Sequence, residues 1–298
     1  MFSIVMPSYN RAAILQRALT AMLAMDGIDA CELIVVDDGS TDATPEVLER
    51  ITRQAPGLVR MVHQENAGPG VARNTALALA RRARILFLDD DVFPEPDLLR
   101  AHARLLDQGF DLSQGLLRWH PDLADSWLMR HMDAHGMQFA FDRVHDDQDL
   151  PYRYVYTANL AVTRRCAETV GGFDAVFAAK RYAFEDTAFA YALKKSGCRM
   201  GLNRQALAYH YHPMSPEGLI GREYTVGYAL GILREHYPEI ARDLGLGRDA
   251  PWRDLVTRIL GWMCRTPVTR HLGNEIRLRL ACRESFGRGM MDHAQHGD

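Results

Sequence analysis

Strand-like and helix-like segments alternate along residues 1–115, and this alternation limits the possible folds more than any other feature. Four short apolar runs have the length and composition of buried strands: residues 2–6, 32–36, 58–62 and 85–88. The segments between them place apolar side chains at helical spacing. Strands and helices in this order build a mostly parallel sheet with helices on its faces. The sequence therefore predicts an α/β fold.

Polar and glycine-rich clusters follow all four strands. They are residues 7–11, residues 37–42, residues 66–74, and the three consecutive aspartates at 89–91. The carboxyl ends of parallel strands meet at one edge of an open sheet, and ligands bind at that edge. We therefore expect a ligand site built from these clusters.

The three aspartates repel one another, so their placement after a buried strand is costly unless a positive group sits beside them. A divalent cation shared with a phosphorylated ligand is the natural partner, because hard cations take carboxylate and phosphate oxygens. The alternative is a solvated acidic turn ahead of a helix that begins near Pro96.

The clusters after the second and third strands have the chemistry of a nucleotide site. Asp37 and Asp38 can accept hydrogen bonds from a base or a ribose. The loop around Gly68 leads into a helix whose free N–H groups suit phosphate, and Arg73 lies one turn further in. The loop matches neither the phosphate-loop nor the dinucleotide fingerprint. The alternative for the cluster at residues 37–42 is a plain capped turn. The alternative for the loop around Gly68 is a surface loop in which Arg73 is solvated.

Bulk composition excludes several classes of protein. The net charge of -3 carries no signature of nucleic-acid binding, and the five cysteines form no CxxC pair, which favours a reducing compartment. No run reaches the ~18 apolar residues of a membrane span, and the chain opens on a strand rather than a signal peptide. We expect a cytoplasmic protein, with peripheral contact at the inner face of the membrane as an option.

The regular alternation ends near residue 111. The sequence predicts strands over residues 112–117, 154–162, 199–202 and 206–209, and helices over residues 122–138 and 184–195. A short helix ends at Gly171-Gly172. From about Ser215 the chain is predicted to be helical, with a separate helical hairpin starting at Pro251.

Several motifs now resemble a known family. Residues 4–11, 35–42, 66–74 and 88–91 are similar, in order, to the nucleotide-sugar-binding half of a family 2 glycosyltransferase, and residues 157–160, 170–174 and 184–186 to its acceptor half. The resemblance covers about residues 2–235. It implies the nucleotide-diphospho-sugar transferase (type A) fold, a mostly parallel central sheet flanked by helices, with a helical C-terminal appendage. The implied domains are 1–235, divided into halves 1–115 and 116–235, and the helical region 236–298.

The resemblance also implies roles for the donor-site residues. Pro7, Tyr9, Arg11 and Asp38 fall where the family binds the nucleotide base. Asp90 matches the aspartate that faces the ribose and the metal, and Asp91 the one that holds the divalent ion, Mg2+ or Mn2+, bridging the diphosphate. Such an ion stabilises the charge that the nucleoside diphosphate gains on leaving. Asp89 is expected to support the loop.

On the acceptor side, Asp186 matches the family's general base, and Glu185 is the fallback. Without the resemblance, both carboxylates would be interpreted as exposed acidic residues in the first turn of a helix, where the helix dipole favours negative charge. His210 and His212 are two residues apart on an extended segment, so their side chains point the same way. Either one is a candidate for the metal or the diphosphate, and a structural histidine is the alternative for each.

Residues 114–119 come close to the Gln-x-x-Arg-Trp motif of processive polysaccharide synthases. The spacing is one residue too long, and the segment precedes Glu185-Asp186 instead of following it. Transfer of a single sugar is therefore favoured over polymer export.

The segment from Pro251 to Met290 is rich in arginine and carries an apolar face at helical spacing. A basic amphipathic helix with tryptophans can lie on an anionic membrane, where a lipid-linked acceptor would be found. Packing on the catalytic domain or on a second subunit is favoured, because amphipathic helices are common in soluble proteins.

The sequence thus predicts a metal-dependent, inverting glycosyltransferase that moves one sugar from a UDP-, GDP- or dTDP-linked donor to a hydroxyl of a carbohydrate or lipid-linked acceptor. Polysaccharide, glycolipid or glycoconjugate biosynthesis is the expected setting. A nucleotidyltransferase acting on sugar phosphates is one alternative. That class of enzyme needs a glycine-rich loop with a basic residue directly after the first strand, where this chain has residues 7–10. A catalytically inactive nucleotide-sugar-binding protein is the other.

Overall fold

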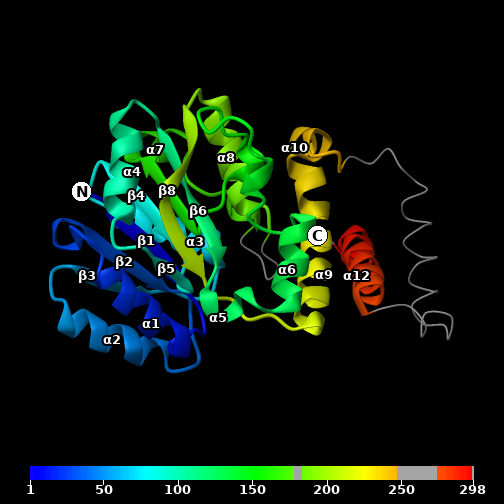
Figure 1. Cartoon of the computed structure of the whole chain (residues 1–298), viewed down its shortest axis with the longest axis horizontal. Coiled ribbons are helices and arrows are strands. Elements are labelled where there is room, and N and C mark those ends of the chain that lie inside the picture. Colours follow the sequence, from blue (N-terminus) through cyan, green and yellow to red (C-terminus); the bar gives the residue numbers. More distant parts are fainter. Residues whose placement is uncertain (178–182, 247–273, 297–298) are drawn as a thin grey trace. The chain divides into compact units, whose positions relative to one another are not determined.

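The computed structural model describes residues 1–177, 183–246 and 274–296 (Figure 1). The chain divides into two compact units. The first unit comprises Met1–Ala175 and Phe189–Pro213, and the second comprises the described residues of Val176–Ala188 and Met214–Asp298.

The first unit is built on an eight-stranded mixed sheet with the strand order β3-β2-β1-β4-β7-β6-β8-β5. Its strands are β1 (Ser3–Ser8), β2 (Glu32–Asp37), β3 (Val59–His63), β4 (Arg84–Leu88), β5 (Val92–Pro94), β6 (Leu112–Trp119), β7 (Asn159–Thr163) and β8 (Met200–His210). Strands β1 to β4 are parallel, β7 and β5 run antiparallel to their neighbours, and β6 pairs in parallel with β8. The predicted α/β fold with a mostly parallel sheet is confirmed.

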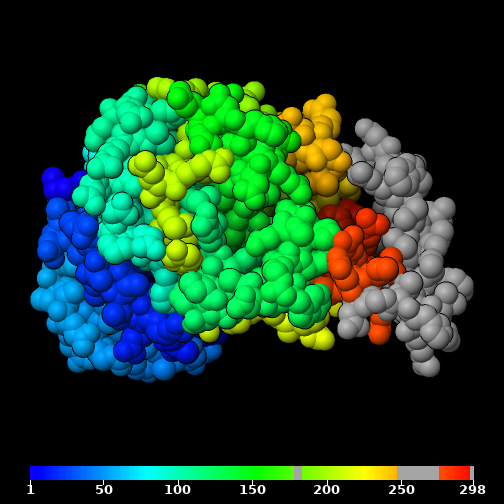
Figure 2. Space-filling view, in the orientation of Figure 1, coloured from blue at the N-terminus to red at the C-terminus, as the bar shows by residue number. Residues whose placement is uncertain are grey.

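Helices surround this sheet and make up most of the second unit. They are α1 (Ala12–Leu23), α2 (Thr44–Gln54), α3 (Pro69–Leu79), α4 (Leu98–Asp107), α5 (Pro121–Ala124), α6 (Trp127–His135), α7 (Arg164–Thr169), α8 (Glu185–Lys195), α9 (Pro216–His236), α10 (Pro238–Asp243) and α12 (Asn274–His296). Helices α1 and α2 pack side by side and form a continuous surface in the space-filling view (Figures 1 and 2). Helix α3 packs on β1 and β2. Because parallel crossovers are right-handed and the strand order reverses after β3, α3 lies on the opposite face from α1 and α2.

The core of the first unit follows from burial of the sheet on both faces. Every residue of β1 is buried, which explains why its sequence is continuously apolar from Ile4 to Pro7. Phe87 of β4 meets the ring of Phe173 edge-on at 5.4 Å between centroids, and Phe173 stacks on Phe189 at 4.3 Å. Full burial of a phenylalanine stabilises a fold by roughly 1.5–3 kcal/mol, so this cluster is a major contact between sheet and helix.

A buried polar network ties α4 to the centre of the sheet. The His102 Nε2–H donates to Asn159 Oδ1 at 2.9 Å, because the Asn159 amide nitrogen is directed to backbone carbonyls. The Ser113 hydroxyl then donates to His102 Nδ1, also at 2.9 Å, and Asn203 reaches both Ser113 and the Ala101 carbonyl. His102 is fully buried and neutral in this arrangement. The network fixes one imidazole tautomer and the positions of β6, β7 and β8.

Four predicted elements differ from the structure. The helix expected over 122–138 is two helices, because α5 stops at Ala124 and Gly136 ends α6 in a left-handed conformation. The strand expected over 154–162 begins only at Asn159, after a single 3-10 turn. The two strands expected over 199–202 and 206–209 are one strand, β8, with a register shift opposite Gly115/Leu116. Strand β5 was not expected at all.

In the second unit, α9 and α12 pack through glycines. A Cβ on Gly227 would collide with the Phe286 carbonyl, and a Cβ on Gly289 would collide with the Tyr224 carbonyl. The Tyr224 hydroxyl donates to Asp292. Residues 274–296 therefore pack on α9, whereas residues 251–273, which include the apolar face of the predicted amphipathic helix, lie outside the described part of the chain. Among the described helices, none is long and apolar enough to cross a membrane.

The buried His102 predicts a pH dependence of stability. Burial lowers the pKa of His102 to about 4, whereas the unfolded chain has the ordinary value of 6.5. As the pH falls from 6.5 toward 4, only the unfolded state takes up this proton, so the free energy of unfolding decreases by up to about 3 kcal/mol. The matched variant His102→Gln keeps a donor and an acceptor but does not titrate. Denaturant unfolding over a pH series is expected to show a smaller acid-induced loss in the variant; equal losses would contradict this role.

Candidate active site

Strand β5 brings the acidic turn to the histidines. Strand β4 ends at Leu88, the aspartates follow, and β5 then pairs antiparallel with the end of β8, placing Val92 opposite His210. The Tyr211 N–H donates to the Asp91 carbonyl at 2.8 Å. Because β1, β2, β4, β6 and β8 all point the same way, their carboxyl ends share this edge of the sheet. The acidic turn and the histidines therefore lie at the edge of the sheet where the sequence predicted a ligand site.

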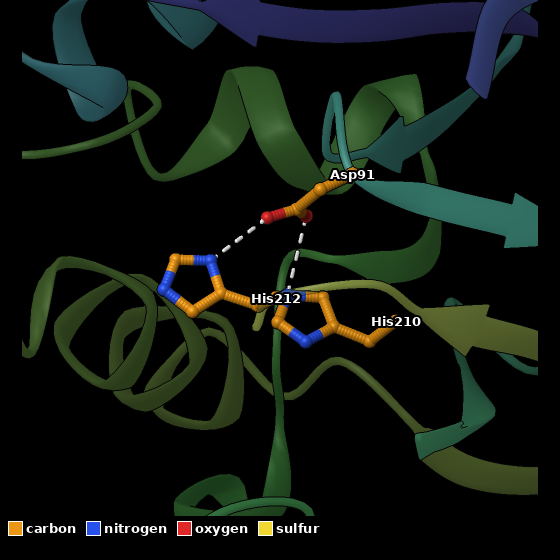
Figure 3. A group of neighbouring side chains, drawn as sticks. All are labelled: Asp91, His210 and His212. Atoms are coloured by element: carbon orange, nitrogen blue, oxygen red, sulfur yellow. Dashed lines mark hydrogen bonds and ion pairs between the residues drawn. The ribbon is translucent and has the colours of Figure 1, made fainter. Parts of the chain in front are cut away.

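Asp91, His210 and His212 form a compact group (Figure 3). The His210 Nε2 lies 3.2 Å from one carboxylate oxygen of Asp91, and the His212 Nδ1 lies 3.2 Å from the other. The two imidazole rings stack at 5.7 Å between centroids, so the prediction that they point the same way is confirmed. Asp91 is 3% exposed and His210 is 7% exposed.

The charges of this group are set by burial and by each other. Burial would raise the pKa of Asp91, but the charge of His210, hydrogen bonds from both imidazoles and the charge of Arg11 outweigh it and hold that pKa far below its usual range. Burial would lower the pKa of His210, but the Asp91 carboxylate raises it. Asp91 is therefore an ionised carboxylate with two nitrogen neighbours.

Asp90 lies in a different environment from Asp91. Its Oδ2 accepts a hydrogen bond from the Ser8 hydroxyl at 2.6 Å, and its Oδ1 lies 3.9 Å from the Arg11 Nε. Burial and repulsion by Asp91 raise the pKa of Asp90 to about 7, although Ser8 and Arg11 oppose the shift. The pKa values of these two adjacent buried carboxylates are thus shifted in opposite directions, because both histidines contact Asp91 and neither contacts Asp90.

The donor set of this group fits a divalent cation. One carboxylate oxygen and two imidazole nitrogens lie within 4.8 Å of one another. In the described part of the chain, the buried His210 Nδ1 has no hydrogen-bond partner, so the polar contact of this ring is directed at Asp91. Carboxylates suit Mg2+ and Mn2+, and imidazoles favour the transition metal of the two.

Asp38 holds the glycine loop. Its Oδ1 accepts from the Gln64 side chain at 2.7 Å and from the Ala67 N–H at 2.9 Å, and its Oδ2 accepts from the Gly68 N–H at 2.8 Å. Gly68 precedes α3 with a φ of 91°, a left-handed conformation that favours glycine. The carboxylate is directed at the loop, and its contact with a nucleotide base stays a prediction.

Arg73 is buried and not the solvated surface arginine of the alternative interpretation. It is 3% exposed and donates from Nη2 to Asp89 Oδ1 at 2.8 Å, with its guanidinium 5.6 Å from the centre of the Phe173 ring. The ion pair ties α3 to the acidic turn after β4. A phosphate contact of Arg73 or of the Gly68 loop stays a prediction.

The loop after β1 is anchored by residues that sequence reasoning missed. Asn10 has a φ of 53°, and its side-chain oxygen accepts from the Thr41 and Asp42 N–H groups at 2.8 and 3.2 Å. The Arg11 N–H donates to the Thr44 hydroxyl at 2.9 Å. An asparagine in the first loop residues after a strand is a signal for such a left-handed turn. The neighbouring Tyr9 is 43% exposed, and its role stays a prediction with that of Pro7.

Glu185 and Asp186 belong to the second unit. Both lie in the first turn of α8, and the Thr187 N–H donates to Asp186 Oδ1 at 2.7 Å. Phe184, just before them, has a φ of 70°, a conformation that costs a non-glycine residue on the order of 1–3 kcal/mol. Strain of this kind is common beside functional residues. The role of either carboxylate as a base stays a prediction.

Comparison with known proteins adds a family match. The family model described as glycosyl transferase family 2 matches residues 3–168. The hyaluronan synthase of Pasteurella multocida is 25% identical over 272 residues, which cover 81% of this chain and 28% of that protein. The chain spans about a third of the length of the first curated relatives that it matches.

Solved structures share the fold. The mannosyltransferase PcManGT from Pyrobaculum calidifontis, in complex with GDP-Man and Mn2+, has a TM-score of 0.67 at 19% identity and covers 100% of this chain and 88% of its own. TarS 1–349 of S. aureus, in complex with UDP-GlcNAc, has a TM-score of 0.58 at 16% identity and covers 99% of this chain and 91% of its own.

The contacts of Asp38 predict the effect of Asp38→Asn. The substitution turns an amide NH2 toward at least one loop N–H, so we expect the free energy of unfolding to fall by about 2 kcal/mol, the scale of a hydrogen bond to a charged group. The control is Glu65→Gln, which removes the same charge from an exposed position in the same loop. Denaturant unfolding measures both. Equal stabilities of the two variants would show that Asp38 does not hold the loop.

Proposed function

The chain belongs to glycosyltransferase family 2, and from that premise we propose that it is a metal-dependent, inverting glycosyltransferase that moves a single sugar from a nucleotide-diphospho-sugar to an acceptor hydroxyl. The observation that carries this proposal is the grouping of Asp91, His210 and His212 beside Asp90 at the carboxyl edge of the sheet. Nucleotide ligands bind at this edge in open α/β sheets.

Asp91 and one or both of His210 and His212 would hold Mg2+ or Mn2+, with Asp90 facing the metal and the ribose. The metal would neutralise the charge that gathers on the diphosphate as it leaves. The protein's own contribution is a carboxylate that is ionised at every physiological pH and fixed by β5–β8 pairing, so little reorganisation is needed when the donor binds.

The donor would extend from this edge over the loops after β1, β2 and β3. Pro7, Tyr9, Arg11 and Asp38 would surround the base, and the N–H groups near Gly68 together with Arg73 would face phosphate. GDP-Man and UDP-GlcNAc accompany the two structural neighbours, and we infer a UDP-, GDP- or dTDP-linked donor for this chain.

Asp186 would accept the proton of the acceptor hydroxyl as its oxygen attacks the anomeric carbon, which inverts the configuration there. Glu185 is the second candidate for this step. The acceptor would be a carbohydrate or a lipid-linked sugar in polysaccharide, glycolipid or glycoconjugate biosynthesis, the setting indicated by relatives such as the hyaluronan synthase.

A thermal-shift screen tests the donor and metal assignments together. We expect the full chain to melt at a higher temperature with one of the UDP-, GDP-, dTDP- or CMP-sugars, and more so with Mn2+, because a ligand that binds only the native state stabilises it. The metal-dependent part of this shift is expected to vanish in Asp91→Asn. A shift that is independent of Mn2+, or that Asp91→Asn retains, would remove the metal from the proposal.

The same donor then tests the base. Asp186→Asn is expected to keep the wild-type thermal shift but to lose at least about a hundredfold in transfer rate, the lower range for a general base. Glu185→Gln is the matched control on the neighbouring carboxylate. A large loss in Glu185→Gln with a near-normal rate in Asp186→Asn would exchange the two roles.

A further inference from the structure

We propose that Arg11 is an internal counter-ion that occupies the cation position of the Asp91–His212 pair, and that a metal ion and Arg11 exclude each other there. The inference rests on the proposed metal site and deepens it. It makes Arg11 a positioning residue that controls metal binding before the donor arrives.

The distances show a guanidinium placed among prospective metal ligands. The Arg11 Nη2 lies 3.3 Å from His212 Nδ1 and 3.6 Å from Asp91 Oδ2. The Arg11 Nε lies 3.9 Å from Asp90 Oδ1. One side chain thus approaches two carboxylates and one imidazole.

The His212 Nδ1 cannot satisfy both of its neighbours. It lies 3.2 Å from Asp91 Oδ2 and 3.3 Å from the Arg11 Nη2. A protonated Nδ1 donates to the carboxylate but opposes the N–H of Arg11, and an unprotonated Nδ1 accepts from Arg11 but faces the carboxylate lone pairs. A metal ion removes the conflict, because an unprotonated nitrogen and a carboxylate oxygen can both be its ligands.

The burial of the two carboxylates and the length of the Arg11 contacts point the same way. Asp90 and Asp91 are 7% and 3% exposed, and the Arg11 guanidinium lies 3.9 and 3.6 Å from them. Its contacts are also longer than the 2.7–2.9 Å that is typical of charge-assisted hydrogen bonds. Arg11 is therefore a loosely held counter-ion that a divalent cation can displace.

The fold lets the Arg11 side chain leave while its backbone stays. The backbone N–H is fixed by the Thr44 hydroxyl, and the carbonyl accepts the first hydrogen bonds of α1 from Ile14 and Leu15. The side chain is 36% exposed, so one side of it is open to solvent. Once displaced, the guanidinium stays tethered beside the site, where it can donate hydrogen bonds to the bound nucleotide.

Titration of the nucleotide-free full chain with Mn2+, followed by the electron paramagnetic resonance signal of the free ion, tests this competition. We expect Arg11→Gln to bind Mn2+ on the order of tenfold more tightly than wild type, because a positive charge within about 4 Å is removed. Arg11→Lys is expected to stay closer to wild type. Arg17→Gln is the control, since Arg17 lies on α1, the helix that follows Arg11, but contacts Phe93, Tyr211 and Asp122.

The outcomes separate this inference from the proposed function. Unchanged or weaker Mn2+ binding in a folded Arg11→Gln protein, with binding still lost in Asp91→Asn, would overturn the role of Arg11 and leave the metal site standing. If Arg17→Gln gained the same affinity for Mn2+, the gain would come from the change in net charge, and this outcome would also overturn the role of Arg11. Absence of Mn2+ binding in every variant would overturn both. With the donor added, Arg11→Gln is expected to bind the nucleotide-sugar more weakly than wild type, because it lacks the guanidinium contact with the donor.

Discussion

Two buried carboxylates in sequence, Asp90 and Asp91, are the constraint on which the first unit depends. A folded chain tolerates such a pair only if each charge has its own partners. Ser8 at the end of β1 hydrogen-bonds Asp90, the two histidines at the end of β8 approach Asp91, and Arg11 reaches toward both. The acidic turn therefore links the first strand of the sheet to its last long one, and it gives the site a fixed carboxylate.

The loops around this turn are held by further polar contacts. Asp38 fixes the loop at Gly68, Asn10 fixes the loop after β2, and Arg73 fixes the acidic turn through Asp89. Each contact joins segments that follow different strands, so the loops form one connected edge. Residues that the sequence marked for ligand binding thus also stabilise the fold, and substituting them changes both properties.

Local patterns were enough to predict the parallel strands, because strands buried on both faces are continuously apolar and easy to recognise. Strand β5 was missed because it has three residues and no such pattern, and its pairing with β8 depends on residues more than a hundred positions away. For the same reason the sequence could place Asp91 and His210 in one site only through family resemblance. The burial of Arg73 could not be predicted from the sequence, because it depends on tertiary contacts with Asp89 and Phe173, which follow other strands.

The central claim is that Asp91 and the histidines hold the metal on which donor binding depends. Anomalous scattering from crystals of the full chain grown with Mn2+ and either UDP or GDP tests it most directly. We expect a manganese peak within coordination distance of an Asp91 oxygen and at least one imidazole nitrogen, in contact with the diphosphate. A bound diphosphate with manganese elsewhere, or with no manganese at all, would contradict the claim.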